Sequence, residues 1–118
     1  MINLPDFVKE AQKDDDIYSK LMAISQEAIE EAHYETAYHA LYAALHYAQE
    51  IGDESRLKAV EEAAIAQRDW IDAQAPKHRM SSQSATLRQG VSLYDTLRRQ
   101  AATQALLKRN NTGFKQKN

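Results

Sequence analysis

The chain contains no cysteine, only three glycines and only two prolines among its 118 residues. Without cysteine there can be no disulfide framework, no thiolate metal site and no cysteine nucleophile. Because glycine and proline are the residues that most strongly interrupt helices, their scarcity leaves few natural breaks in a helical chain. We therefore expect a mostly helical protein in a compartment that does not rely on disulfide bonds, such as the cytoplasm.

Long apolar runs and period-two patterns are also missing. No stretch approaches the ~18 consecutive apolar residues of a membrane span. The first residues, MINLPDFVKEAQKDDD, lack the basic start and apolar core of a secretory signal. Alternating branched or aromatic residues, which are typical of strands, do not occur. The sequence predicts an all-α, cytoplasmic protein with no membrane segment.

Acidic residues are nearly absent from the last third of the chain. Residues 1–76 contain 16 acidic and 6 basic side chains, a net charge of −10, whereas residues 77–118 contain 1 acidic and 9 basic side chains, a net charge of +8. One interpretation is a basic helix that packs on an acidic body. The other is a nucleic-acid-binding end. Its phosphate contacts would be Arg88, Arg99, Lys108 and Arg109.

Apolar periodicity divides the first half of the chain into two helices. Over residues 15–32 one stripe is formed by Ile17, Leu21, Ile24 and Ala28. The following stripe is formed by Tyr34, Ala37, Leu41, Ala44, Leu45 and Ala48. At 100° per residue this second stripe points roughly to the opposite side of the helix from the first. A single straight helix would need two opposite apolar faces, so we expect a break near residues 32–34 and an antiparallel hairpin.

Two further helices are expected in the second half. Gly52 is suited to a left-handed cap, Asp53 to capping the next helix, and Pro76 to ending it. That third helix, over residues 54–75, would bury Leu57, Val60, Ala64 and Ile71, with Trp70 at a rim. A fourth helix over residues 83–109, capped by Ser81 or Ser82 and containing Gly90, would bury Leu87, Val91, Tyr94, Leu97, Ala101 and Ala105. Arg98 points toward this side, where it could meet an acid from the first or third helix.

The two ends of the chain complete the expected organisation. Residues 4–12 predict a short leading helix with Pro5 in its first turn and with Phe7 and Val8 as apolar anchors. Asp14, Asp15 and Asp16 would then cap the next helix. We expect a single domain over residues 1–109, followed by a flexible basic tail over residues 110–118.

The first hairpin shows an alternation of large and small residues. The pattern spans about residues 18–64 and includes Leu21, Ile24, Ser25, Ala28, Ala32, Tyr34, Ala37, Leu41 and Ala44. It resembles the tetratricopeptide repeat (TPR), a helical hairpin of 34 residues. The resemblance implies a protein-binding scaffold. Because repeats need stacked neighbours for stability, we expect a compact four-helix arrangement, TPR-like or bundle, rather than a solenoid.

Histidine and tyrosine are concentrated in residues 33–54, HYETAYHALYAALHYAQEIGDE. On a helical wheel one face, opposite the apolar stripe, contains Glu35, His39, Tyr42, His46 and Glu50. The pairs Glu35/His39 and His46/Glu50 lie about 10 Å apart at 1.5 Å per residue, so they cannot bind one metal ion. Tyrosine is frequent in interfaces. We interpret this face as an interaction surface, the alternative being an ordinary solvated face.

Sequence patterns for catalysis are missing as well. The chain has no glycine-rich phosphate loop, and the serines near His78 have no positioned acid that would complete a triad. We therefore expect no enzyme activity, no cofactor and no metal. The predicted function is a non-catalytic protein–protein interaction or scaffold module that binds a protein partner or itself. The alternative is a small nucleic-acid-associated helical protein that acts through its basic C-terminal region.

Overall fold

Helices form nearly all of the described chain. The computed structural model describes residues 16–117, with side chains up to residue 110. The helices are α2 (Ile17–Glu30), α3 (Tyr34–Ile51), α4 (Glu54–Gln74), α5 (Ser82–Leu87) and α6 (Leu93–Lys117), and no strand occurs in this part of the chain. The predicted all-α class is confirmed. The predicted leading helix over residues 4–12, with Phe7 and Val8, lies outside the described residues.

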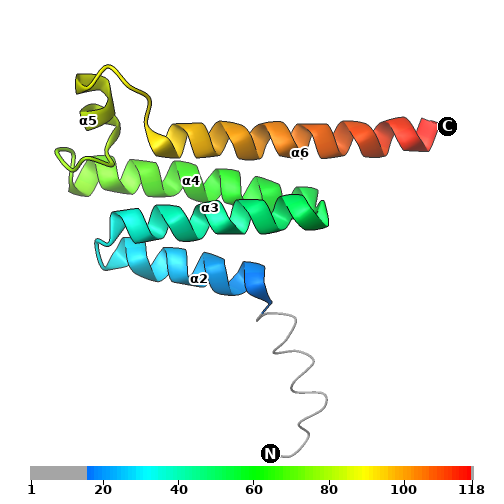
Figure 1. The fold of residues 1–118 in the computed structure, drawn as a ribbon, viewed down its shortest axis with the longest axis horizontal. Coiled ribbons are helices and arrows are strands. Elements are labelled where there is room, and N and C mark those ends of the chain that lie inside the picture. The colour runs from blue at the N-terminus through cyan, green and yellow to red at the C-terminus, as the bar shows by residue number, and fades with distance from the viewer. Residues whose placement is uncertain (1–15, 118) are drawn as a thin grey trace, which may run out of the picture.

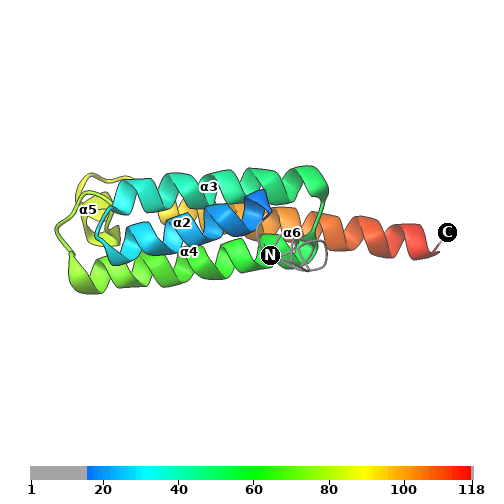
Figure 2. The same cartoon turned by 90° about the horizontal axis from the view of Figure 1, so that it is seen from below.

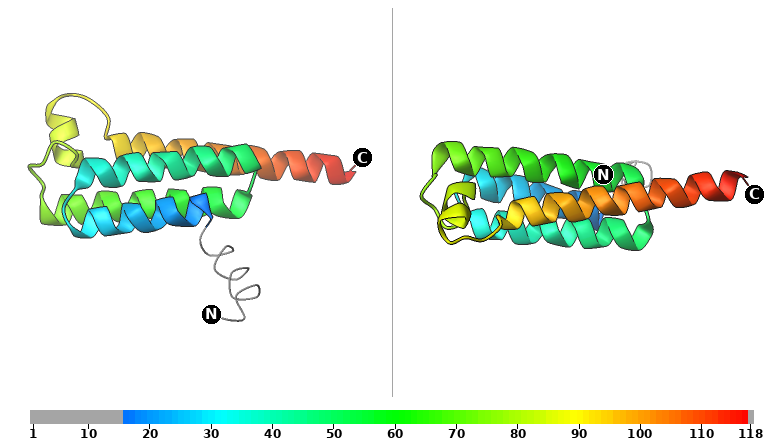
Figure 3. Two further views of the ribbon diagram at one scale, coloured as in Figure 1. Left: turned by 60° about the horizontal axis from the view of Figure 1, so that its bottom comes forward. Right: turned by 90° about the horizontal axis from the view of Figure 1, so that it is seen from above.

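The four long helices run alternately in opposite directions and form a compact bundle (Figure 1). α3 and α4 lie side by side, with α2 on one face of this pair and α6 on the other (Figures 2 and 3). α2 packs mainly on α3, whereas α6 packs mainly on α4. α2 and α4 consequently run parallel, with their C-terminal ends at the same end of the bundle (Figure 1).

The chain reverses direction between α2 and α3, as the opposed apolar stripes predict. Ala32 adopts a φ of 64°. The N–H of Ala32 donates to the carbonyl of Ile29 at 3.2 Å, and the N–H of His33 donates to the carbonyl of Ala28 at 2.8 Å. This is a Schellman motif with alanine in the left-handed position that glycine usually occupies.

The remaining predicted caps are present at the start of α2 and between α3 and α4. Gly52 has a φ of 66°, and a Cβ at this position would lie 2.9 Å from Nζ of Lys108. Asp53 caps α4 by accepting from the N–H of Arg56 at 3.2 Å. Asp16 caps α2 in the same way. Short side-chain and backbone caps of this kind fix where each helix begins and ends.

The predicted single helix over residues 83–109 is wrong. α5 ends at Leu87, and the chain turns before α6 begins at Leu93. Gln89 adopts a left-handed φ of 58°. The Oγ of Ser92 accepts from the N–H of Tyr94 at 3.2 Å, which caps the start of α6. The helical spacing of apolar residues continues through this turn in the sequence, so the spacing alone does not indicate the break.

The break changes the positions of three residues that were expected inside the fourth helix. Gly90 lies in the connection, and Leu87 and Val91 are 77% and 56% exposed rather than buried. At its other end α6 continues past Arg109 to Lys117 and extends beyond α3 and α4 (Figure 1). The flexibility expected for residues 110–118 stays a prediction.

The core agrees with the predicted stripes of α3, α4 and α6 but only in part with that of α2, where Ala28 is buried and Leu21 packs against the core. The buried residues include Ala37, Leu41, Ala44, Leu45, Ala48, Leu57, Val60, Ala64, Ile71, Tyr94, Leu97, Ala101 and Ala105. In α2, by contrast, Ile17 and Ile24 are 58% and 49% exposed. The buried face of α2 is centred on Tyr18, Ser25 and Ile29. The helix is rotated because Tyr18 and Ser25 contact groups on α4.

Candidate interaction site

A chain of hydrogen bonds crosses the bundle and joins its four long helices. The hydroxyl of Tyr94 on α6 donates to Oε1 of Gln67 on α4 at 2.7 Å. Nε2 of Gln67 donates to Oγ of Ser25 on α2 at 2.7 Å. The hydroxyl of Ser25 donates to the carbonyl of Ala37 on α3 at 2.8 Å. All four residues are buried, so the chain satisfies polar groups that water does not reach.

The tyrosine at one end of this chain is held in its neutral form. Burial raises the pKa of the Tyr94 hydroxyl, and the nearby Tyr38 raises it further. Tyr94 was predicted only as an apolar residue, and Ser25 only as the small residue of a repeat. Gln67 was not singled out, because one glutamine on a helix gives no sequence signal that it is buried.

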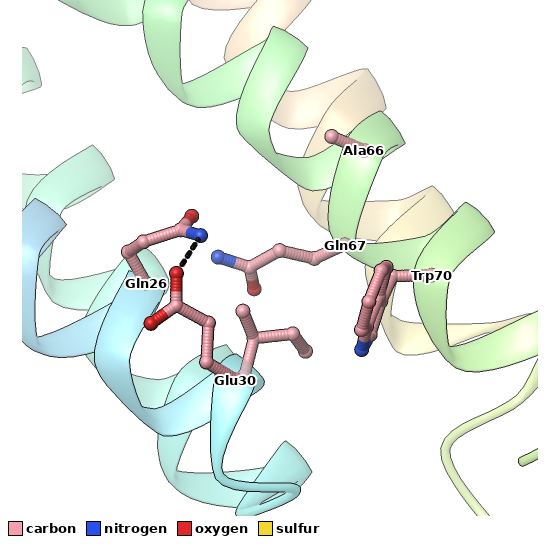
Figure 4. A pocket seen from close by; sticks show the side chains of 6 residues that line it. Gln26, Glu30, Ala66, Gln67 and Trp70 are labelled. Atoms are coloured by element: carbon pink, nitrogen blue, oxygen red, sulfur yellow. Dashed lines mark hydrogen bonds between the residues drawn. The ribbon is translucent and has the colours of Figure 1, made fainter. Parts of the chain in front are cut away.

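A cavity of about 240 Å³ opens between α2 and α4 (Figure 4). Its lining residues are Gln26, Ile29 and Glu30 from α2 and Ala66, Gln67 and Trp70 from α4. The space exists because α2 packs mainly on α3 and because the side chain of Ala66 is too short to fill it. Buried Gln67 therefore serves both the hydrogen-bond chain and the inner wall of the cavity.

The outer edge of the cavity combines an aromatic ring with a carboxylate. Trp70, the only tryptophan of the chain, is 47% exposed. It stands on α4 across from Gln26 and Glu30 on α2 (Figure 4). The carboxylate of Glu30 accepts from Nε2 of Gln26 at 2.8 Å. The predicted rim position of Trp70 is thus confirmed, and the cavity beside it was not predicted.

The groove between α2 and α4 is closed at the opposite end. The guanidinium of Arg56 on α4 lies 2.7 Å from Oδ2 of Asp16 and 4.7 Å from the ring centre of Tyr18. The hydroxyl of Tyr18 donates to the carbonyl of Arg56 at 3.4 Å. Burial raises the pKa of this tyrosine. These contacts hold α2 against α4 where both helices begin and leave the groove open where they end.

The predicted interaction face of α3 lies on the outside of the bundle. It consists of Glu35, His39, Tyr42, His46 and Glu50. Both histidines and Glu50 are exposed, whereas Glu35 and Tyr42 are half-buried. The ring of Tyr42 lies 4.6 Å from that of His46 and stacks on Tyr38 with centroids 5.8 Å apart. Glu35 forms an ion pair with Arg79. The role of this face stays a prediction.

Tyr38 belongs beside this face although the sequence did not indicate it. It lies between Tyr42 and the buried Tyr94, whose ring it meets edge-on at 5.6 Å. Burial raises the pKa of Tyr38 as well. The aromatic row therefore continues from the surface of α3 to the hydrogen-bond chain inside the bundle.

The basic residues predicted to contact nucleic acid do not form one cluster. They are Arg88, Arg99, Lys108 and Arg109, and all are exposed. Arg88 lies in the connection before α6 and donates to the carbonyl of Arg79 at 3.3 Å. Arg99 and Lys108 are nine residues apart on α6, or about 14 Å along its axis. Nε of Arg109 lies 3.9 Å from Glu54, so part of this positive charge faces acids of the bundle.

An ion pair joins α4 and α6, but the base lies on α4 and the acid on α6, the opposite of the prediction. Arg98 was expected to meet an acid from another helix, but the acid that it meets is Asp95 on α6 itself, at 3.9 Å. Asp95 also accepts from Nη1 of Arg68 on α4 at 2.7 Å. This hydrogen bond raises the pKa of Arg68. Arg68, which belongs to the acidic residues 1–76, thus pairs with Asp95, the one acidic residue among residues 77–118.

Within residues 16–117, no group of three or more histidine, aspartate or glutamate side chains is arranged to hold a metal ion. None of the described helices is both long and apolar enough to span a bilayer. The resemblance of the first hairpin to a TPR stays a prediction, since no family model, no curated protein and no solved structure matches the chain.

Proposed function

We propose that this protein is a non-catalytic interaction module that binds a segment of a partner protein in the groove between α2 and α4. The observation that supports this proposal is the position of Trp70, half exposed beside a cavity. Tryptophan dominates the binding energy of many interfaces when partner side chains fill the surrounding space. At about 240 Å³ the cavity is smaller than a typical small-molecule site, so one side chain of a partner fits it better than a metabolite does.

The walls of the groove are already in place before a partner arrives. Gln67 is held by hydrogen bonds to both Ser25 and Tyr94. At the closed end, Arg56 fixes the separation of α2 and α4 through Asp16. A site that does not have to be ordered on binding loses less conformational entropy, which favours affinity.

The test is a comparison of proteins captured from cells by three variants of the chain. Trp70→Ala removes the proposed anchor, and Leu87→Ala removes an exposed apolar side chain on α5 as a matched control. A third variant, His39→Ala with His46→Ala, tests the outer face of α3. Removing an anchor typically weakens binding by at least about 2 kcal/mol, roughly thirtyfold. We expect this loss for Trp70→Ala and full binding for Leu87→Ala.

Helical content and urea unfolding of each variant show whether its fold is intact. A partner that binds Trp70→Ala as well as the unchanged chain would contradict the proposed groove. If the double histidine variant alone lost the partner or lost self-association in light scattering, the contact surface would be the outer face of α3 instead.

A further inference from the structure

The open end of the α2/α4 groove carries negative charge from two sources. The first is the carboxylate of Glu30, which lines the cavity. The second source is the backbone, because α2 and α4 run parallel and both end here (Figure 1). The last turn of a helix has a partial negative charge. Neither α2 nor α4 has a basic residue in its last turn.

The groups around the cavity are suited to one kind of cationic side chain. The face of an indole ring attracts cations, and it attracts the planar guanidinium of arginine in particular. A carboxylate such as that of Glu30 can accept two parallel hydrogen bonds from the same guanidinium. Trp70 and Glu30 stand on opposite walls of the cavity (Figure 4), so a guanidinium between them could contact both at once.

We infer that the cavity binds an arginine side chain of the partner segment. This inference rests on the proposed function and specifies the chemistry of the partner. Trp70 stacks on the guanidinium, Glu30 accepts its hydrogen bonds, and Gln26 offers a further amide oxygen beside Glu30. The apolar stem of the arginine passes Ile29 and Ala66, which line the same space. An uncharged side chain would use Trp70 but would gain nothing from Glu30 or from the two helix ends.

A pair of peptides that differ in one atom group tests the charge directly. We would use an alanine-based helical peptide with one arginine and an otherwise identical peptide with citrulline, the uncharged analogue of arginine. Trp70 is the only tryptophan, so its fluorescence and the NMR signal of its indole N–H report on this site alone. From the usual strength of surface ion pairs and helix ends, the arginine peptide should bind about five- to tenfold more tightly.

Two variants separate the contribution of the cavity from general attraction to an acidic protein. Glu30→Gln keeps the shape of the wall and should weaken the preference for arginine, leaving only the smaller part that comes from the indole face and the two helix ends. Glu50→Gln removes the same charge from the exposed outer face of α3 and should leave the preference for arginine unchanged. High salt should reduce the preference for the arginine peptide, because dissolved ions screen charges that are exposed to solvent at this edge.

The outcomes distinguish this inference from the proposed function. Equal binding of the two peptides would overturn the inference and leave the groove as an uncharged binding site. No response of Trp70 to the arginine peptide at about 10 mM, where a contact of a few kcal/mol is detectable, would also overturn it. The proposed function itself fails only if Trp70→Ala still captures the cellular partner normally.

Discussion

Three buried polar side chains, Ser25, Gln67 and Tyr94, find in one another the hydrogen bonds that water would otherwise supply. Each belongs to a different helix, and each uses its polar atom in the interior of an otherwise apolar bundle. A buried group that loses its partner costs more than a hydrogen bond contributes on average, because its desolvation is no longer compensated. The free energy of unfolding should therefore fall when a single oxygen atom is removed from this chain of hydrogen bonds.

Tyr94→Phe provides the direct test of this expectation. The change removes the donor to Oε1 of Gln67 and keeps the volume of the ring. We expect the free energy of unfolding in urea to fall by about 1–3 kcal/mol. Tyr47→Phe, at a half-buried tyrosine of α3, is the matched control and should change it by less than about 0.5 kcal/mol. Equal effects of the two variants would show that the hydrogen bond from Tyr94 to Gln67 does not stabilise the fold.

The same tyrosine predicts how stability depends on alkaline pH. The pKa of Tyr94 is raised by burial in the folded chain, while in the unfolded chain it takes the ordinary value of about 10. The neutral form is therefore favoured by folding. This contribution is fully present below about pH 10 and is lost progressively at higher pH, because the unfolded chain releases the proton first. We expect the free energy of unfolding to decline above about pH 10.

A stability curve of Tyr94→Phe over the same pH range isolates this contribution. Its decline should be shallower than that of the unchanged chain, with a remainder from Tyr18 and Tyr38, whose pKa values are also raised by burial. Parallel curves for the two proteins would contradict the assignment to Tyr94.

At the scale of whole elements, the turn between α2 and α3 stores strain in one residue. Ala32 has a φ of 64°, a conformation that is unfavourable for alanine and open to glycine. We expect Ala32→Gly to raise the free energy of unfolding by about 0.5–1 kcal/mol, after the greater freedom of glycine in the unfolded chain is subtracted. Urea unfolding gives this value.

The same substitution in the middle of a helix should have the opposite effect. Ala43 is exposed near the centre of α3, and Ala43→Gly should lower the free energy of unfolding by about 1 kcal/mol. A lower stability of Ala32→Gly would show that the left-handed turn is stabilised by something other than its backbone conformation.

Sequence patterns predicted helices well where an apolar stripe and a cap agree. The stripe of α3 ends at Gly52, and the stripe of α4 ends before Pro76. The break between α5 and α6 was missed because a left-handed glutamine, Gln89, gives no signal comparable to glycine. A usable signal was present in Ser92, which is followed three residues later by Asp95, a spacing typical of a helix start.

The candidate site could be predicted only in part. The sequence placed Trp70 to one side of its helix, and the structure agrees. The cavity depends on how far α2 stands from α4, and that separation follows from Arg56 and Asp16 meeting across 40 positions of sequence. Such pairings between distant residues are not contained in local periodicity. The rotation of α2, which exposes Ile17, has the same origin.

For the molecule as a whole, the unequal distribution of charge leads to a test of nucleic-acid binding. The exposed bases of α6 are spread over its length, and Arg109 already lies 3.9 Å from Glu54. Non-specific binding requires many phosphate contacts made together and weakens steeply with salt. We therefore expect no gel shift of generic RNA or DNA with micromolar protein at physiological salt.

A gel-shift series from low to physiological salt would check this expectation. Binding that persists at physiological salt would favour the nucleic-acid role over the protein-interaction role, provided that it is lost when Arg99 and Lys108 are both changed to glutamine.

The chain of hydrogen bonds that starts at Tyr94 and ends at Ala37 also affects how the helices are aligned along the axis of the bundle. The seams between the helices contain many alanines, whose short side chains resist sliding of one helix along another less than large interlocking side chains do. Only one alignment brings the serine, the glutamine and the tyrosine to the same height. A shift of one helix by a single turn, about 5.4 Å, would break every hydrogen bond that this helix makes in the chain. Their polar contacts therefore determine where each helix stops along its neighbours, a choice that the small apolar side chains leave open.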